Sequence, residues 1–166
     1  MNKIYWAALI GVMAAVTAVI SVICIPTPFG VPITLQVLGV ALCGFLLGRK
    51  GTVAVLVFLA LAALGMPVLA GFRGGIGEFF SPTGGFLWGF PLLAFLCGFG
   101  DDKRKKYPFA MFGLALCYVL GAAKFAASAG SADSLFWLLP CFLKDVVLLF
   151  LAGYIATKLQ RKIKRF

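Results

Sequence analysis

Ionisable side chains stand out within two apolar stretches of this chain, GFRGGIGEFFSPTGGFLWGF at 71–90 and CFLKDVV further on. Arg73 and Glu78 are the charged residues of the first stretch, and Lys144 and Asp145 are those of the second. An arginine fork binds a carboxylate through two hydrogen bonds. Ionisable groups in an apolar helix usually face a cavity or the interior of a bundle. These residue types favour the binding of a small polar or anionic ligand.

Catalytic chemistry has weaker support. The chain has no histidine, which argues against a metal site or a proton relay, and no nucleophile–base pair stands out. A small membrane enzyme that uses Asp145 or Glu78 as a base is the alternative from this class. The cysteines are scattered without a CxxC pair, so we expect them to be small packing residues; they are Cys24, Cys43, Cys97, Cys117 and Cys141.

The segment 71–90 also contains a helix start. Ser81 can act as N-cap with Pro82 at the first helical position. The helix that follows would then present free backbone N–H groups to an anion. Glycines permit close packing or positive φ here: Gly71, Gly74, Gly75 and Gly77. The alternative is an exposed hairpin loop with a stray arginine, and no GKS or GKT follows to support a nucleotide P-loop.

Other polar residues lie within the apolar runs. Thr34 and Gln36 belong to VPITLQVLG, where Gln36 needs partners; contact between helices and contact with a ligand are both open. Lys124 either snorkels or binds a ligand. Lys144 and Asp145 are adjacent, so on a helix they point about 100° apart and are expected to be poor partners for each other.

Two acids have simple alternatives to a role in the site. Asp133, with Ser131 or Ser134, most simply caps the last helix. Glu78 either pairs with Arg73 or is solvated.

Apolar helices must position these side chains. Of 166 residues, 63% are hydrophobic and 12% are charged, against about a quarter charged in soluble domains. A membrane-spanning helix needs about 20 apolar residues. The sequence predicts an all-α integral membrane protein, a single domain with a ligand-site loop at 67–83 and six transmembrane helices at about 4–25, 32–48, 52–66, 84–100, 108–128 and 135–157.

The basic residues orient these helices. With the N-terminus in the cytoplasm, all of the 15 Lys and Arg residues except Arg73, Lys124 and Lys144 fall in inside segments. The positive-inside rule therefore predicts cytoplasmic N- and C-termini. The net charge of +10 is then a topology signal with contacts to anionic lipid headgroups. Nucleic-acid binding is not expected, because no soluble basic domain exists.

Small residues recur along the first helix. Ala7, Gly11 and Ala15 are spaced by four, and Ala14 and Ala18 repeat the pattern. Such a stripe lets another helix approach closely. From the residues alone, packing inside the protein and packing against a partner protein are equally open.

Three segments carry a resemblance to a known family: VPITLQVLGVALCGFLLGRKG, LAALGMPVLAGFRGGIGEFFSPTGGFLWGF and LPCFLKDVVLLFLAGYIA. They resemble the BioY family, the biotin-specific substrate-binding (S) components of energy-coupling factor (ECF) transporters. The resemblance implies the six-helix S-component fold, no catalysis and no cofactor. It implies biotin uptake across the bacterial plasma membrane, with biotin captured in a pocket roofed by the loop after the third helix.

The resemblance also implies partners and contacts. The partners are a transmembrane coupling protein, docked on Ala7, Gly11 and Ala15, and two ABC-type ATPases. The biotin carboxylate suits Arg73, Lys124 or the fourth helix's N-terminus, the ureido ring suits Asp145 and Gln36, and the apolar parts suit Phe72, Phe79 and Tyr118. The full set of expected ligand contacts is Thr34, Gln36, Phe72, Arg73, Gly74, Gly75, Ser81, Thr83, Tyr118, Lys124 and Asp145.

One position departs from the family. A lysine often stands three residues after the matching aspartate, where this chain has Leu148. Which cation meets the carboxylate, Arg73, Lys124 or Lys144, is therefore open. The alternatives are an S component for another vitamin-like acid such as niacin or lipoate, and a structural membrane subunit that binds no ligand.

Overall fold

The computed structural model describes residues 3–26, 32–99, 103–129 and 138–163. Within these residues the predicted all-α, six-helix fold is confirmed. The six long helices are α1 (Lys3–Val22), α2 (Gln36–Leu47), α3 (Gly51–Ala63), α5 (Gly84–Cys97), α6 (Lys103–Ala129) and α8 (Leu138–Ile163). Shorter elements are the 3-10 turn η1 (Gly48–Lys50), the one-turn helix α4 (Gly77–Phe80) and two strands, β1 (Cys24–Ile25) and β2 (Ile33–Thr34).

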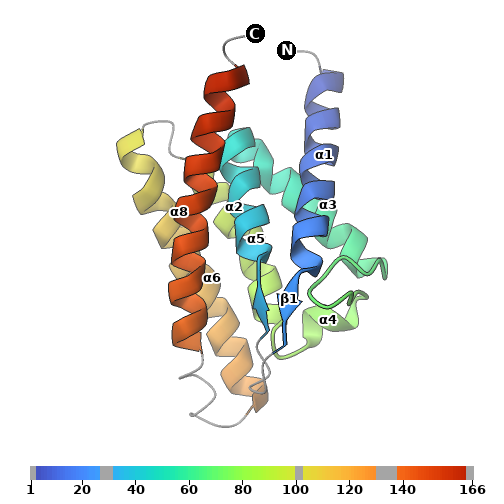
Figure 1. The fold of residues 1–166 in the computed structure, drawn as a ribbon. Helices are drawn as coiled ribbons and strands as arrows, with labels where there is room; N and C mark the ends of the chain where they lie inside the picture. The colour runs from blue at the N-terminus through green and yellow to red at the C-terminus, as the bar shows by residue number, and fades with distance from the viewer. Residues whose placement is uncertain (1–2, 27–31, 100–102, 130–137, 164–166) are drawn as a thin grey trace.

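The two ends of the bundle differ. The first turn of α1 and the last turn of α8 lie at one end, and β1 and α4 lie at the opposite end (Figure 1). β1 and β2 pair antiparallel, with Cys24 opposite Thr34 and Ile25 opposite Ile33. This pairing explains why α2 begins at Gln36 and not at 32 as expected, because Ile33 and Thr34 take extended backbone.

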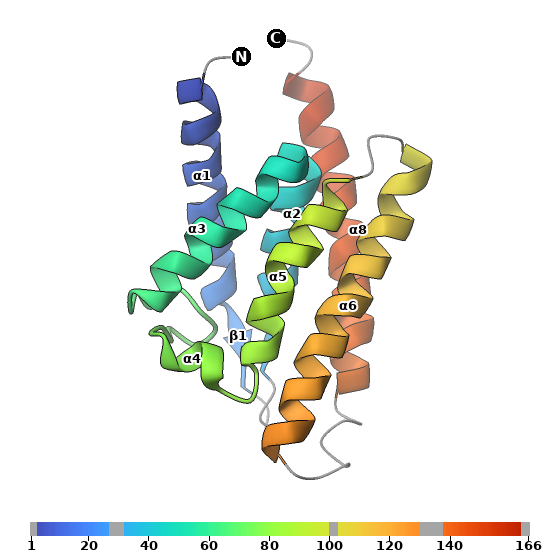
Figure 2. The same cartoon turned by 180° about the vertical axis from the view of Figure 1, so that it is seen from behind.

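Glycine breaks the apolar stretch that contains α2 and α3. Gln36–Ala63 is 28 residues long and apolar enough to span a membrane as one helix. Gly48 has a φ of +61°, a left-handed conformation that glycine adopts at no steric cost, and the chain turns there. In Figure 2 α3 slopes away from the end of α2 toward α4. With 12 and 13 residues, each helix is shorter than the roughly 20 residues of a straight span.

α2 lies at the centre of the molecule. Ten of its 12 residues are buried, and it contacts α1, α3, α5 and α8. Val40 of α2 is fully buried, as are Phe58 of α3, Leu93 of α5 and Leu149 of α8, the helices that α2 contacts. An apolar helix with no exposed stripe belongs in a core, so the position of α2 follows from its composition.

α5 and α6 pack closely against each other. A Cβ on Gly89 would lie 2.6 Å from Cys117 Sγ, and one on Gly85 would lie 2.4 Å from the Leu120 carbonyl oxygen. Small residues four apart allow this approach in membrane helices. The packing of α5 against α6 therefore helps to fix the position of α5 (Figure 2).

α1 has two different faces. Ala14 and Ala18 are buried in the core. Ala7, Gly11 and Ala15 are exposed, and a Cβ added to Gly11 would meet nothing within 4 Å. The two alanine series predicted as one repeating pattern therefore have separate surroundings.

Candidate ligand-binding site

A pocket lies between α2, α5, α6 and α8 and the loop that carries α4. Apolar side chains make most of its wall, and four ionisable residues face it. Its lining is Pro32, Thr34, Gln36, Val37, Leu69, Ala70, Arg73, Glu78, Thr83, Phe86, Leu87, Phe90, Tyr118, Cys141, Lys144 and Asp145. Segments from both halves of the chain are needed to close it.

Asp145 is the most buried charge of the pocket, with 6% of its surface exposed. The Tyr118 hydroxyl donates a hydrogen bond to Asp145 Oδ2. Lys144 Nζ lies 2.7 Å from Asp145 Oδ1 as an ion pair. This pair contradicts the expectation that adjacent residues would be poor partners, because the flexible four-carbon stem of Lys144 folds its ammonium back to its neighbour.

Asp145 keeps hydrogen-bonding capacity. Oδ1 is buried and lies beside the Lys144 ammonium. A carboxylate oxygen has two lone pairs. Asp145 lines the pocket, so its carboxylate is among the groups that a ligand N–H would meet.

Lys144 also ties α8 to the first loop. Its ammonium donates a hydrogen bond to the Thr34 carbonyl oxygen. Thr34 belongs to β2 and lines the pocket together with Gln36. The same side chain thus compensates a buried acid and fixes one wall of the pocket.

Aromatic rings form the apolar wall. Phe86 and Phe142 each meet Tyr118 edge to face, with ring centroids 5.3 and 5.1 Å apart. Phe90 follows Phe86 by one helical turn and lines the same pocket. Rings in this arrangement suit a flat or aliphatic part of a ligand.

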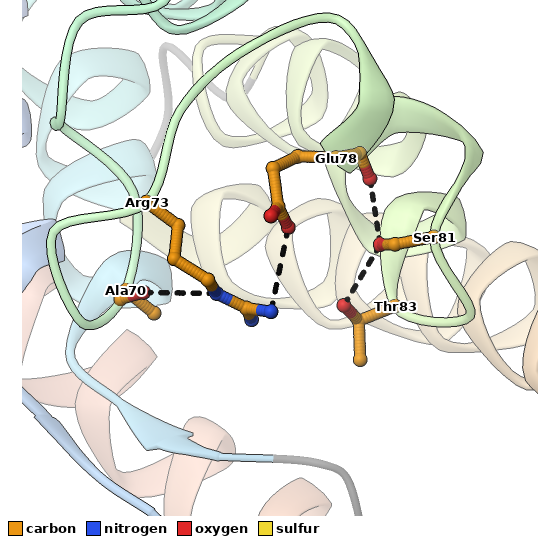
Figure 3. A network of polar contacts seen from close by, with 5 residues as sticks. All are labelled: Ala70, Arg73, Glu78, Ser81 and Thr83. Carbon is orange, nitrogen blue, oxygen red and sulfur yellow. Dashed lines mark hydrogen bonds and ion pairs between the residues drawn. The ribbon is translucent and has the colours of Figure 1, made fainter.

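The loop 67–83 supplies the other charged residues of the pocket. Arg73 Nη1 is 3.5 Å from Glu78 Oε2, and Arg73 Nε donates to the Ala70 carbonyl oxygen at 3.4 Å. Figure 3 shows the guanidinium directed toward Glu78, with Ser81 and Thr83 beside it. Arg73, Glu78 and Thr83 line the pocket, so the loop contributes one charge of each sign.

Ser81 does not cap the fourth long helix, contrary to the sequence prediction. It is the C-terminal cap residue of α4, and its hydroxyl donates to the Glu78 carbonyl oxygen at 2.7 Å. α5 begins at Gly84, with Thr83 at its N-cap position and no side-chain capping bond. The hydroxyl of Ser81 instead bonds to the one-turn helix α4, which was not expected from the sequence.

Two glycines shape this loop. Gly75 has a φ of +104°, which side-chain-bearing residues rarely adopt. A Cβ on Gly74 would lie 2.1 Å from the Met66 carbonyl oxygen. Both glycines are needed for the backbone conformation of the loop, and neither lines the pocket.

Lys124 contacts the loop, not the pocket. Its ammonium donates to the Phe79 carbonyl oxygen at 2.6 Å and lies 5.5 Å from the centre of the Phe80 ring. Trp88 Nε1 donates to the same carbonyl at 3.4 Å. Two donors from α5 and α6 therefore hold the end of α4.

The structure brings together part of the predicted site. Six expected residues line the pocket: Thr34, Gln36, Arg73, Thr83, Tyr118 and Asp145. Five expected residues are absent from the lining: Phe72, Gly74, Gly75, Ser81 and Lys124. Phe72 is 73% exposed with a φ of +59°, and Phe79, also suggested as an apolar contact, is buried outside the lining.

Sequence reasoning did not include Glu78, Lys144, Phe86, Leu87 or Phe90 among the ligand contacts. Glu78 was expected either to pair with Arg73 or to be solvated, and Lys144 was one of three candidate cations for the ligand carboxylate. Phe86, Leu87 and Phe90 share one face of a helix, at spacings of one, three and four residues. Their position directly after PTGG could have indicated that this face lines the site. Asp133, Ser131 and Ser134 lie outside the described residues.

A bundle of apolar helices around a pocket lined by two ion pairs defines a multi-pass membrane protein with a small-molecule site. A model of the BioY family matches residues 2–165. The chain belongs to the BioY family, as its sequence motifs indicated.

Individual relatives point to the same family. The biotin transporter BioY of Rhodobacter capsulatus is 44% identical over 127 residues, which cover 70% of this chain and 67% of the relative. A probable biotin transporter BioY of Pyrococcus horikoshii is 39% identical over 132 residues, covering 78% and 81%. The crystal structure of an S-component for biotin from an ECF-type ABC transporter is similar, with a TM-score of 0.88, 28% identity, and coverage of 97% and 95%.

Proposed function

We propose that this chain is the substrate-binding S component of an ECF-type transporter and that it binds biotin for uptake across the membrane. One observation carries the proposal: the likeness to the S-component for biotin extends over 97% of the chain. The S component performs no catalysis; we infer that ATP hydrolysis in partner subunits supplies the energy.

The pocket chemistry suits biotin. Its ureido ring offers two N–H donors, which match the carboxylate of Asp145, and Gln36 lies in the same lining. Its carboxylate matches the guanidinium of Arg73. Its thiophane ring and aliphatic chain match the wall of Tyr118, Phe86 and Phe90.

Biotin binding to the purified protein tests the function. Calorimetry should give a dissociation constant in the nanomolar range. This corresponds to a binding free energy of about −12 kcal/mol, which a small ligand enclosed in a preorganised pocket can reach. A thermal-shift panel should show stabilisation by biotin and none by niacin, lipoate or pantothenate. Stabilisation by another acid alone would change the assigned ligand, and no stabilisation at all would favour a structural subunit.

We infer that the pocket opens to the outside and that both termini are cytoplasmic. Basic residues support this orientation: Arg49 and Lys50 lie in η1, near the start of α1, and Lys158 lies in the last turns of α8. Arg49 stacks 4.5 Å from the Phe99 ring centre and Lys50 3.8 Å from the Trp6 ring centre. Cations over aromatic rings at one end of a bundle suit an interface with anionic headgroups.

We further propose that the exposed stripe Ala7, Gly11 and Ala15 docks a transmembrane coupling protein that carries two ABC-type ATPases. Space beyond Gly11 is open, so Gly11→Leu should leave the fold and biotin binding intact. It should abolish copurification of the coexpressed coupling protein, because a bulky side chain separates the helices. Val16→Leu is the matched control, exposed on the same helix about 140° around from Gly11. Equal copurification of both variants would contradict this interface.

A further inference from the structure

The ionisable residues of the pocket form two neutral pairs. Lys144 Nζ is 2.7 Å from Asp145 Oδ1, and Arg73 Nη1 is 3.5 Å from Glu78 Oε2. All four line the pocket. A ligand carboxylate that enters must therefore compete with a resident acid for a cation.

The two pairs differ in how readily they exchange partners. The Asp145 side chain is 8% exposed, and Tyr118 also donates to it. The Arg73 and Glu78 side chains are 49% and 21% exposed, and their separation is longer. Exposed ion pairs contribute little, whereas a buried charge left without its partner is costly. The pair at Arg73 is therefore the one that an incoming carboxylate opens.

The backbone around Arg73 and Glu78 is held independently of their pairing. The Leu69 N–H donates to the Arg73 carbonyl oxygen at 2.9 Å. Ser81 donates to the Glu78 carbonyl oxygen from its N–H at 3.3 Å and its hydroxyl at 2.7 Å (Figure 3). The Glu78 side chain can consequently rotate away while the loop keeps its conformation.

We propose that Glu78 is a specificity-determining residue: its carboxylate occupies Arg73 until the carboxylate of the ligand displaces it. The inference deepens the proposed function and rests on it. Glu78 lowers the affinity for anionic ligands through competition and repulsion. It acts little on an uncharged analogue, which does not need Arg73.

The experiment compares biotin with biotin carboxamide by calorimetry on the purified protein. Glu78→Gln should bind biotin about three- to fivefold more tightly than wild type, the fold-change expected for an exposed ion pair. The affinity for the carboxamide should change less than about twofold, because no charge is exchanged. The measured quantity is the ratio of the two affinities, which a general change in folding would not alter.

Three further variants keep the test decisive. Glu78→Asp retains the charge and should keep the ratio near wild type, and Glu78→Ala should move it in the direction of Glu78→Gln if the glutamine variant folds poorly. Lys158→Gln removes an exposed charge outside the pocket lining and should leave the ratio unchanged. An unchanged ratio in both neutral Glu78 variants, with biotin bound normally by wild type, would overturn this inference alone. Wild-type protein that binds neither compound would overturn the proposed function as well.

Discussion

Lys144 on α8 and Lys124 on α6 make the same kind of contact with different consequences. Each donates a hydrogen bond to a backbone carbonyl oxygen of a connecting segment, Lys144 to Thr34 in β2 and Lys124 to Phe79 in α4. Lys144 also pairs with Asp145 and lines the pocket. Lys124 lies outside the lining, and its ammonium also approaches the Phe80 ring.

The difference shows that an ammonium in a membrane helix is not by itself evidence of ligand binding. Such a charge needs an oxygen partner, and a backbone carbonyl is sufficient. Lys124 stabilises the loop, whereas Lys144 belongs to the electrostatics of the site. The following three variants test this assignment, in order of decreasing effect.

Asp145→Asn tests the acid whose pairing with Lys144 distinguishes that lysine from Lys124. The change replaces an ionised acceptor with an amide of the same shape and leaves Lys144 without its counter-ion. Biotin affinity should fall about 100-fold, as expected for the loss of a charged hydrogen bond together with an unpaired charge. Calorimetry measures this loss. An affinity within about threefold of wild type would exclude Asp145 from the site.

Lys144→Met keeps the apolar stem and removes the ammonium. Asp145 is then uncompensated, and its charge makes the potential of the pocket more negative for a ligand carboxylate. Biotin affinity should fall about tenfold, corresponding to about 1.4 kcal/mol, and the carboxamide should lose less. An equal loss for both ligands would reduce Lys144 to a structural role.

Lys124→Met should have the smallest effect. It removes one of two donors to the Phe79 carbonyl oxygen, so α4 is held less firmly. The dissociation rate of biotin should rise about threefold, an effect of less than about 1 kcal/mol, and the preference for biotin over its carboxamide should not change. Stopped-flow displacement measures the rate, and Lys158→Met is the matched control. A change in ligand preference would place Lys124 in the site after all.

Much of the fold is predictable because apolar runs and their interruptions are local signals. Lys3–Val22 agrees with the expected first helix to within three residues, and Leu138–Ile163 covers the described part of the expected last helix but ends six residues later. A break between α2 and α3 was expected at 49–51, but the positive φ of Gly48 and the one-turn helix α4 were not. Both depend on glycine conformations and loop contacts that hydropathy does not report.

The site is predictable to a smaller extent. Arg73 and Asp145 stood out because charge is rare in this chain, and both line the pocket. Ser81 satisfied a local capping rule, but a carbonyl three residues earlier received its hydroxyl. The pairing of Lys144 with Asp145 contradicted a rule about helix directions, because that rule describes Cβ vectors and not the ends of long side chains.

The sequence by itself determined that this protein is a bundle of apolar helices, and its motifs identified the BioY family. It also determined which few charges must have a special environment, since an ionisable group in an apolar helix needs a partner wherever it lies. Only the tertiary structure decided what those partners are. The rotation of each helix and the path of each loop place Lys144 in the pocket and Lys124 outside it, and these depend on packing between segments up to 110 residues apart.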